Sequence, residues 1–267
     1  MARRCARLSR TGASARRPVG VVQPRSAPGD GNGREGAGAA GGRAVSGYSA
    51  AVEERTVLFD LDGTLVDGGA AMLACLAEAC RAVGVAVPPE ESLRRFIGPP
   101  LERTFAERFG LDEASCARAV AAYRTGYVAG GAVDAAVLYP GIADLLERLG
   151  RQGVRCAVAT SKPTPQAERI LANLGVRRHF AGVFGADPAG RRAAKEEVVA
   201  DACVALGLDA DRAVMVGDTV YDVHGAAAHG IGCIGVLWGF GTRDELEQAG
   251  ALAVASHPIE VGDLLGA

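Results

Sequence analysis

Lysine is nearly absent from this sequence of 267 residues: 29 residues are lysine or arginine, and only Lys162 and Lys195 are lysine. So strong a preference for arginine indicates a bias across the genome rather than selection at each position. A position that keeps lysine against this bias is one where a compact ammonium is expected to matter, because a planar guanidinium binds anions with a different geometry. Both lysines are therefore candidate site residues.

Long apolar segments are also missing, since no run approaches the roughly 20 residues that a membrane-spanning helix needs. The seven cysteines are an odd number and form no CxxC pair, which argues against a disulfide framework and favours reduced thiols in the cytoplasm. The four histidines lack ligand spacing, which argues against a zinc site. The formal net charge of −2 gives no overall signal for nucleic-acid binding.

The N-terminal extension, residues 1–52, has little apolar periodicity and is rich in Arg, Gly, Ala, Ser and Pro. A segment that cannot bury enough apolar surface is expected to stay disordered. Residues 1–50 carry nine arginines against Asp30 and Glu35. Three interpretations remain open: a start codon placed too far upstream, a solvated tail or a functional basic arm. The composition also resembles an organellar transit peptide.

From residue 53 the pattern changes to short apolar runs that alternate with apolar residues at helical spacing. The runs are predicted strands, and they cover residues 56–60, 154–159, 213–216 and 233–237. Buried apolar strands that alternate with helices predict an α/β fold, in which a Rossmann-like parallel sheet has helices on both faces.

Residues 69–138 read almost entirely helical and contain no strand signal. A stretch of about 70 residues is too long for a loop in a compact domain. We expect it to be an inserted, all-helical cap domain. The core domain would then consist of residues 53–68 and 139–267.

Polar residues follow the predicted strands at the ends that share one edge of the sheet, where open parallel sheets bind ligands. Lys195 begins a predicted helix that reaches the same edge. The carboxylates, hydroxyls and ammonium groups expected there belong to Asp60, Asp62, Thr160, Ser161, Lys162, Lys195, Asp218 and Asp222.

Carboxylates so close together repel one another unless a cation lies between them. Ligation by oxygen with open water positions suits Mg²⁺ better than zinc, and Mg²⁺ held by one or two carboxylates usually also binds a phosphate. A neighbouring carboxylate can attack phosphorus and form an aspartyl-phosphate. A second carboxyl can protonate the leaving oxygen and then activate water. The residue types therefore indicate metal-dependent phosphoryl transfer.

The motifs resemble those of the haloacid dehalogenase-like (HAD) hydrolases. The segment DLDGTL at 60–65 is similar to the first motif of that family, and Thr160 matches the second. Lys195 matches the third motif, and Asp218 with Asp222 matches the fourth. The order and spacing agree, and the helical insert stands where this family carries a small cap.

The resemblance implies a role for each of these residues. Asp60 would be the nucleophile, and Asp62 the general acid/base with its carbonyl oxygen on the metal. Thr160 and Lys195 would be catalytic residues that hold the transferring phosphoryl group. The implied Mg²⁺ ligands are Asp60, Asp62, Asp218 and Asp222, the last of them directly or through water.

Three further segments are similar to the phosphoglycolate phosphatase and 5′-nucleotidase branch of the family: FIGPPL at 96–101, TSKP at 160–163 and VLWGFG at 236–241. This resemblance implies that Thr160, Ser161, Lys162 and Lys195 contact substrate. Arg103 in the insert is a further predicted substrate contact, with a surface ion pair to a neighbouring glutamate as the alternative.

The expected function is Mg²⁺-dependent hydrolysis of a small phosphomonoester, either phosphoglycolate-like or a nucleoside 5′-monophosphate, through an aspartyl-phosphate. The expected form is a monomer or homodimer without membrane or nucleic-acid partners. Two alternatives remain open. The same site could serve a phosphotransferase, either a mutase or a protein tyrosine kinase on this fold, with Tyr48 and Tyr221 as first acceptor candidates. The chain could instead be a non-catalytic binding protein that uses its basic arm.

Overall fold

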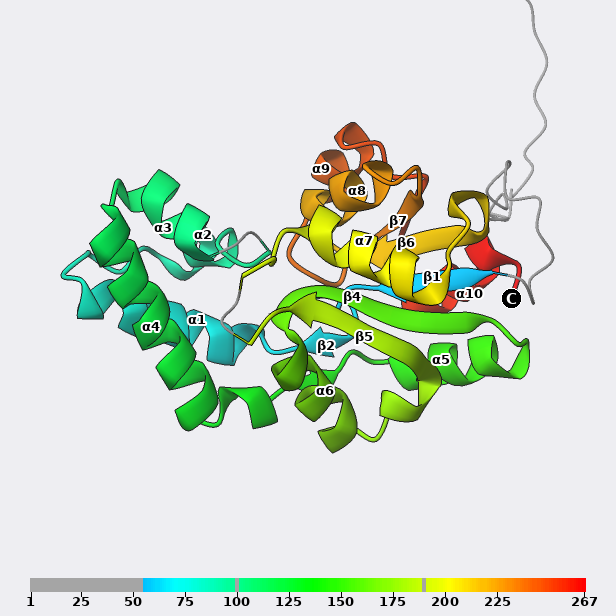
Figure 1. The fold of residues 1–267 in the computed structure, drawn as a ribbon, viewed down its shortest axis with the longest axis horizontal. Helices are drawn as coiled ribbons and strands as arrows, with labels where there is room; N and C mark the ends of the chain where they lie inside the picture. Colours follow the sequence, from blue (N-terminus) through cyan, green and yellow to red (C-terminus); the bar gives the residue numbers. More distant parts are fainter. Residues whose placement is uncertain (1–54, 99–100, 189–190) are drawn as a thin grey trace, which may run out of the picture. The chain divides into compact units, whose positions relative to one another are not determined.

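A computed structural model of the protein describes residues 55–98, 101–188 and 191–267 (Figure 1). The predicted N-terminal extension, residues 1–52, lies outside these ranges, as do Tyr48 and the two prolines of the segment at 96–101. Within the described ranges, no helix is both long enough and apolar enough to cross a membrane.

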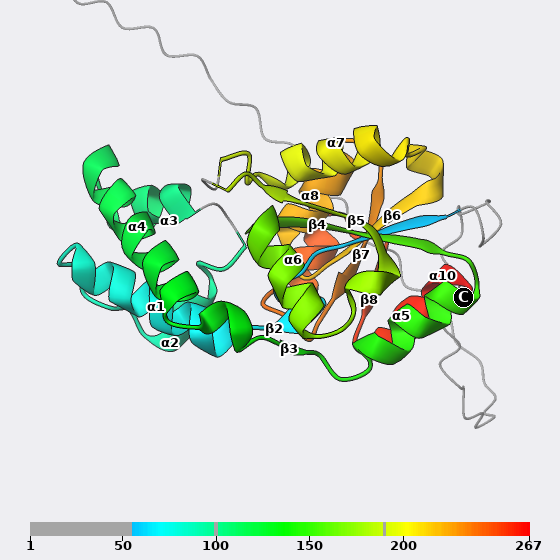
Figure 2. The same ribbon diagram turned by 60° about the horizontal axis from the view of Figure 1, so that its bottom comes forward.

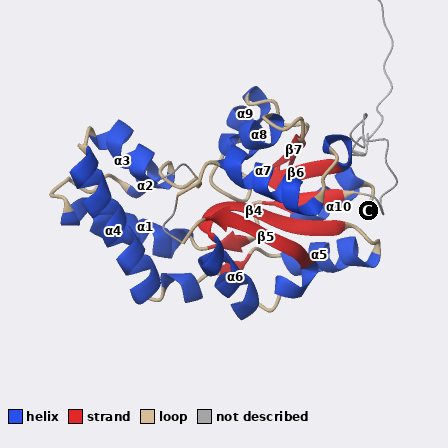
Figure 3. Ribbon diagram, in the orientation of Figure 1, coloured by secondary structure: helices blue, strands red, loops and turns tan. Residues whose placement is uncertain are grey.

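A six-stranded sheet forms the centre of the core, and every neighbouring pair of its strands is parallel (Figure 3). The strand order is β5-β4-β1-β6-β7-β8. The strands are β1 (Thr56–Phe59), β4 (Arg155–Pro163), β5 (Phe180–Ala186), β6 (Ala213–Gly217), β7 (Gly232–Val236) and β8 (Ala253–Ala255). The predicted parallel α/β fold is therefore confirmed.

Alternate residues of each strand face opposite sides of the sheet. In β1, for example, Val57 and Phe59 belong to one buried cluster and Leu58 to another. Side chains of α5, α6 and α10 complete the first cluster, whereas those of α7, α8 and α9 complete the second (Figures 1 and 2). These helices are α5 (Ile142–Arg151), α6 (Thr164–Asn173), α7 (Lys195–Leu206), α8 (Val220–Ala227), α9 (Arg243–Gln248) and α10 (Pro258–Leu265).

The stretch between the first two sheet strands is helical, as predicted, and has a buried cluster of its own. Leu76, Phe105 and Val120 belong to this cluster and come from three different helices. The helices are α1 (Gly69–Ala82), α2 (Glu90–Arg94), α3 (Leu101–Phe109) and α4 (Glu113–Ala129). The division into a cap domain and a core domain stays a prediction, because separate helices with a shared cluster do not by themselves establish independent domains.

A two-stranded antiparallel ribbon joins this helical stretch to the core. Its strands are β2 (Val66–Asp67), where the chain leaves the core, and β3 (Val137–Leu138), where it returns. The strand β3 lies at the end of the range predicted to be entirely helical. A strand of two residues is too short to produce an alternating pattern, so it could not be predicted from the sequence.

The topology places the ends of β1 and β6 side by side. After β1, the chain forms β4 and β5 on one side of β1. It then crosses to the other side of β1, where it forms β6. The register pairs Phe59 with both Val158 and Val216, so β1 and β6 end at a similar level while β4 continues past them to Pro163. This reversal in the direction of strand addition marks the crevice where parallel sheets bind ligands.

Candidate active site

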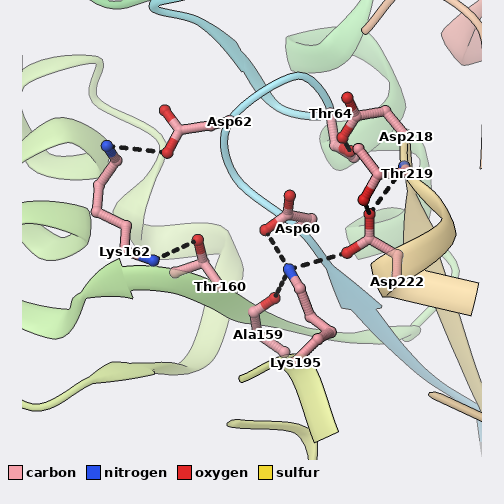
Figure 4. Close-up of polar contacts among 10 residues, drawn as sticks. All are labelled: Asp60, Asp62, Thr64, Ala159, Thr160, Lys162, Lys195, Asp218, Thr219 and Asp222. Carbon is pink, nitrogen blue, oxygen red and sulfur yellow. Dashed lines mark hydrogen bonds and ion pairs between the residues drawn. The ribbon is translucent and has the colours of Figure 1, made fainter. Parts of the chain in front are cut away.

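The loop after β1 carries two of the predicted catalytic carboxylates, Asp60 and Asp62 (Figure 4). The backbone N–H of Asp60 donates to the carbonyl of Val216 at 2.9 Å, which fixes the first carboxylate beside β6. Gly63 turns the loop with a φ of +89°, a conformation that favours glycine. A Cβ at Gly63 would lie 2.2 Å from Oδ2 of Asp218. Glycine here therefore permits both the turn and the approach of the Asp218 carboxylate.

Lys195 is the first residue of α7, as predicted, and its ammonium is buried among three acceptors. Its Nζ lies 2.6 Å from Oδ1 of Asp60, 2.8 Å from Oδ1 of Asp222 and 3.2 Å from the carbonyl of Ala159. Burial acts to lower the pKa of Lys195, but the two carboxylates outweigh it and raise the pKa. A charged ammonium with three donors thus meets three acceptors.

Gly225 of α8 makes room for this lysine. A Cβ at Gly225 would lie 2.5 Å from Cγ and 2.7 Å from Cβ of Lys195. Glycine at position 225 therefore lets α7 and α8 pack closely where the Lys195 side chain extends to Asp60.

Asp218 follows β6 and is completely buried. The hydroxyl of Thr64 donates to its Oδ1 at 3.1 Å, and the backbone N–H of Phe240 donates to its Oδ2 at 2.8 Å. Burial, followed by repulsion from Asp222 and Asp60, raises the pKa of Asp218 despite these hydrogen bonds. The negative charge of this carboxylate is therefore only partly compensated by its protein partners.

Asp60, Asp218 and Asp222 are all buried, and each offers an oxygen atom within 4.8 Å of those of the other two. Burial raises the pKa of Asp60 to about 6, with Lys195 opposing the shift and Asp222 reinforcing it. A divalent cation would relieve this repulsion, and carboxylate oxygens suit Mg²⁺. The residues present therefore fit the predicted metal.

Asp222, like Asp218, has a partner for each of its carboxylate oxygens. Its Oδ2 accepts hydrogen bonds from the N–H and the hydroxyl of Thr219, each at 3.0 Å. Its Oδ1 faces Lys195 at 2.8 Å. Of the three carboxylates only Asp60 lines the cavity among the described residues, and Asp218 and Asp222 complete the cluster behind it.

The second predicted group of site residues lies on β4, which extends through Thr160, Ser161 and Lys162. The backbone N–H of Lys162 donates to Oγ1 of Thr160 at 3.2 Å. The side chain of Lys162 is buried, and its Nζ lies 2.9 Å from Oδ2 of Asp62 and 2.9 Å from the hydroxyl of Tyr127 on α4. Lys162 therefore links a carboxylate of the core to a helix of the insert.

A cavity of about 120 Å³ opens above Asp60, between the core and the helical insert. Six of the predicted residues line it, namely Asp60, Asp62, Thr160, Ser161, Lys162 and Lys195. Asp218 and Asp222 lie behind them and contact Thr64 and Lys195 instead. The structure thus brings the predicted catalytic, phosphate-binding and metal-binding residues together.

Arg103 is the predicted site residue that the structure does not bring to this cavity. Its Nε lies 2.7 Å from Oε1 of Glu107, and both side chains are exposed. This is the surface ion pair that the sequence offered as the alternative, so the arrangement does not support a substrate contact through Arg103. On the same helix, Glu102 does line the cavity, where it pairs with Arg124 at 3.1 Å.

Sequence reasoning missed the residues that the insert contributes to the cavity. Tyr123 and Tyr127 lie one turn apart on α4, with ring centroids separated by 5.8 Å, and both face the cavity together with Arg124. Their spacing of four residues places them on one side of a helix. That was the available signal, but the same spacing is typical of ordinary core residues.

The family model of the haloacid dehalogenase-like hydrolases matches residues 57–236. A tyrosine-protein kinase, PtkA, of Mycobacterium tuberculosis is 40% identical over 209 residues, which cover 78% of this chain and 70% of the kinase. A 5′-nucleotidase of Pseudomonas aeruginosa is 39% identical over 197 residues, which cover 74% of this chain and 89% of the relative.

A crystal structure of a predicted phosphatase from Clostridium acetobutylicum superimposes with a TM-score of 0.75 at 34% identity, covering 78% of this chain and 96% of that one. The predicted resemblance is thus confirmed by sequence, by fold and by the arrangement of the four motifs around one cavity. The chain belongs to the haloacid dehalogenase-like hydrolases and is an enzyme of their phosphoglycolate phosphatase and 5′-nucleotidase branch.

Proposed function

We propose that this enzyme hydrolyses a small phosphomonoester in a Mg²⁺-dependent reaction that passes through an aspartyl-phosphate on Asp60. The observation that carries the proposal is the position of the Asp60 carboxylate. It lines the cavity, contacts the ammonium of Lys195 at 2.6 Å and belongs to the carboxylate cluster that fits a cation. A second carboxylate, Asp62, lines the same cavity.

In the first step, a carboxylate oxygen of Asp60 attacks phosphorus and the bond from phosphorus to the ester oxygen breaks. Asp62, in its protonated form, gives its proton to the departing oxygen, so that an alcohol leaves. Lys195 would supply positive charge, and Thr160 a hydroxyl donor, to the oxygens of the transferring group, which carry the developing charge.

In the second step, Asp62 is a carboxylate and removes a proton from a water molecule, which attacks the phosphorus of the aspartyl-phosphate. The bond to Asp60 breaks, inorganic phosphate is released, and both carboxyl groups return to their starting protonation states. The Oδ1 atom of Asp62 is buried and has no hydrogen-bond partner among the described residues. An Oδ1 atom without a protein partner is available to exchange a proton with the substrate and with water, which supports the role proposed for Asp62.

Mg²⁺ would be held by Asp60 and Asp218, with the backbone carbonyl of Asp62 as a further expected ligand, and Asp222 behind them. When bound, the ion would neutralise negative charge on the cluster and on the phosphoryl oxygens. The chain itself supplies the nucleophile, the proton donor and the fixed positive charge of Lys195.

The test is the turnover of 4-nitrophenyl phosphate by purified Asp60→Asn protein in the presence of Mg²⁺. The amide is nearly isosteric but is not a nucleophile, so we expect activity to fall to background. Glu107→Gln, an acid-to-amide change outside the cavity, serves as the control and is expected to retain activity. Turnover by Asp60→Asn near that of the wild type would overturn the assignment of the nucleophile.

A second candidate function is transfer of the phosphoryl group to a tyrosine instead of water. The 40% identity to a protein named as a tyrosine kinase favours it. Incubation with ATP radiolabelled on its terminal phosphoryl group separates the two, because a kinase leaves the label on protein tyrosine and a phosphatase of small esters does not. Replacing Tyr221 by Phe tests the acceptor candidate that lies within the described residues.

A further inference from the structure

The charged side chains around the cavity are balanced in pairs. Among the described residues that line it, three are cationic and three are anionic. Lys195 pairs with Asp60 at 2.6 Å, Lys162 with Asp62 at 2.9 Å, and Arg124 with Glu102 at 3.1 Å. No cation of the described lining is left over.

The carboxylates behind the cavity shift this balance towards negative charge. Asp218 and Asp222 are fully buried within reach of Asp60. A divalent cation would offset the charges of Asp218 and Asp222. The phosphoryl dianion of a substrate would then be attracted by the metal and by Lys195. A second negative charge on the leaving group would meet no unpaired cation at the wall.

Arg124 is the lining cation best suited to bind such a second charge, because it belongs to the insert and is paired with Glu102 instead of a catalytic carboxylate. Its partner Glu102 comes from the adjacent helix α3 and also lines the cavity. The pair is partly exposed, with side-chain exposures of 34% for Arg124 and 51% for Glu102. Arg124 could therefore turn towards a substrate carboxylate, but the charge of Glu102 would stay close to that carboxylate and repel it.

The uncharged residues that the insert contributes to the wall are mostly apolar, whereas the core contributes the polar Thr160, Ser161, Gln166 and Thr219. Met72, Leu76, Phe96, Ile97 and Leu101 of the insert line the cavity together with Tyr123. Apolar surface of this kind gains free energy when it covers an apolar or aromatic group. It gives nothing to a carboxylate, which would lose hydration without a compensating partner.

We propose that the site selects phosphomonoesters whose leaving group is uncharged and apolar or aromatic, and that Glu102, by occupying Arg124, disfavours esters that carry a carboxylate. The inference rests on the proposed phosphatase function and concerns the leaving-group side of the same site. It places phosphoglycolate-type esters among the poor substrates of this chain.

The test compares esters that are matched in size and differ in charge. One pair is 2-phosphoglycolamide and 2-phosphoglycolate, and the other is benzyl phosphate and 4-carboxybenzyl phosphate. With the full-length protein and Mg²⁺, we expect kcat/KM for the uncharged member of each pair to exceed that for the carboxylate by about tenfold or more.

A variant locates the effect. Glu102→Gln releases Arg124 and is expected to narrow both ratios by about fivefold, mainly by raising kcat/KM for the carboxylates. Glu107→Gln removes a charge from the same helix but outside the cavity, where it pairs with Arg103, and is expected to leave the ratios as they are. The comparison within the wild-type protein does not depend on either variant.

Carboxylate esters that are turned over as well as their uncharged partners would overturn the inference and leave the phosphatase function intact. Ratios that Glu102→Gln does not change would overturn the role given to Glu102. If none of the four esters, nor 4-nitrophenyl phosphate, were hydrolysed, the proposed function itself would be wrong, and this inference with it.

Discussion

The ammonium of Lys162 lies 2.9 Å from Oδ2 of Asp62 and 2.9 Å from the hydroxyl of Tyr127. It also lies 4.2 Å from the centroid of the Tyr127 ring, so the tyrosine contacts the cation with both its face and its hydroxyl. Burial acts to lower the pKa of Lys162, but Asp62 and the tyrosines outweigh it and raise the pKa. A buried cation thus holds one oxygen of Asp62, and the other accepts no hydrogen bond from the described part of the chain.

Replacing Lys162 by Met keeps an unbranched side chain but removes the cation that orients Asp62. We expect kcat/KM for benzyl phosphate to fall by about 10²-fold, the range in which general acid catalysis contributes. The loss for 4-nitrophenyl phosphate is expected to be about tenfold smaller, because a good leaving group needs less protonation. Steady-state kinetics with both esters measure the difference.

Tyr127→Phe is the companion variant, since it keeps the ring near the cation and removes only the hydroxyl. We expect kcat/KM to fall less than in Lys162→Met, and again to fall more for benzyl phosphate than for 4-nitrophenyl phosphate. An equal loss for both esters in Lys162→Met would contradict a role through Asp62 and would assign Lys162 to phosphoryl binding. Circular dichroism and a thermal melt verify that each variant is folded, because a carboxylate that loses its buried partner also costs stability.

Lys195→Arg is expected to reduce turnover by about 10²-fold or more, in the range measured when one fixed donor to the transition state is lost. The ammonium of Lys195 is enclosed by Asp60, Asp222 and the carbonyl of Ala159. A planar guanidinium is larger and directs its donors into a fork, so it cannot reproduce these three contacts. Turnover of 4-nitrophenyl phosphate is the measurement.

Arg243→Lys provides the matched control for this exchange. Arg243 forms an exposed pair with Glu247 on α9, and exposed pairs of this kind contribute little. We expect its turnover and melting temperature to match those of the wild type. Undiminished turnover in Lys195→Arg would show that the site does not require an ammonium at position 195.

The catalytic edge of the sheet was predictable because its signals are local. Asp60 ends an apolar run, Thr160 directly follows another, and Asp218 follows a third after Gly217. The topology of a parallel sheet then brings those ends together. The strands β5 and β8 were not predicted. The first is rich in Gly and Ala and has only its two end residues buried, and the second has three residues, so neither forms a clear apolar run.

The wall of the cavity was not predictable for a different reason. Glu102, Tyr123 and Arg124 reach the site through the packing of α3 and α4, which a single sequence does not specify. Arg103 and Glu102 are adjacent in the chain, yet only Glu102 lines the cavity. Neighbouring residues of a helix point about 100° apart. Which of the two faces the cavity therefore depends on the rotation of α3 about its axis, and the sequence does not specify that rotation.

Gly63→Ala is expected to abolish measurable turnover and to lower the melting temperature. The added Cβ would stand 2.2 Å from Oδ2 of Asp218 and would occupy a backbone with a φ of +89°. Gly84→Ala separates the two effects, because Gly84 has a φ of +73° but no atom within 4 Å of its virtual Cβ. We expect Gly84→Ala to lose about 1–2 kcal/mol of stability and to keep its kcat. Similar kinetics in both variants would show that the contact with Asp218 has no catalytic consequence.

The carboxylate cluster predicts how the effect of Mg²⁺ on stability depends on pH. The pKa of Asp60 in the folded protein is about 6, above its ordinary value of 3.8, so the folded state binds this proton more tightly than the unfolded chain. The resulting stabilisation is complete below about pH 4 and is lost as the pH rises through about 6. Burial and the neighbouring carboxylates raise the pKa of Asp218 as well, which acts in the same direction.

Mg²⁺ and protons compete for the same carboxylates, so saturating Mg²⁺ should raise the melting temperature more at pH 7.5 than at pH 5. The shift of Asp60 corresponds to a penalty on the order of 3 kcal/mol at neutral pH, which metal binding can remove, so the difference is expected to be several degrees. Scanning calorimetry at both pH values, with and without Mg²⁺, measures this difference in the melting-temperature increase.

Asp218→Asn removes one carboxylate and is expected to reduce the pH dependence of the Mg²⁺ effect. Asp263→Asn changes an exposed residue that pairs with Arg148 and is expected to leave that dependence unchanged. An increase in melting temperature that is equal at both pH values would show that the ion binds elsewhere.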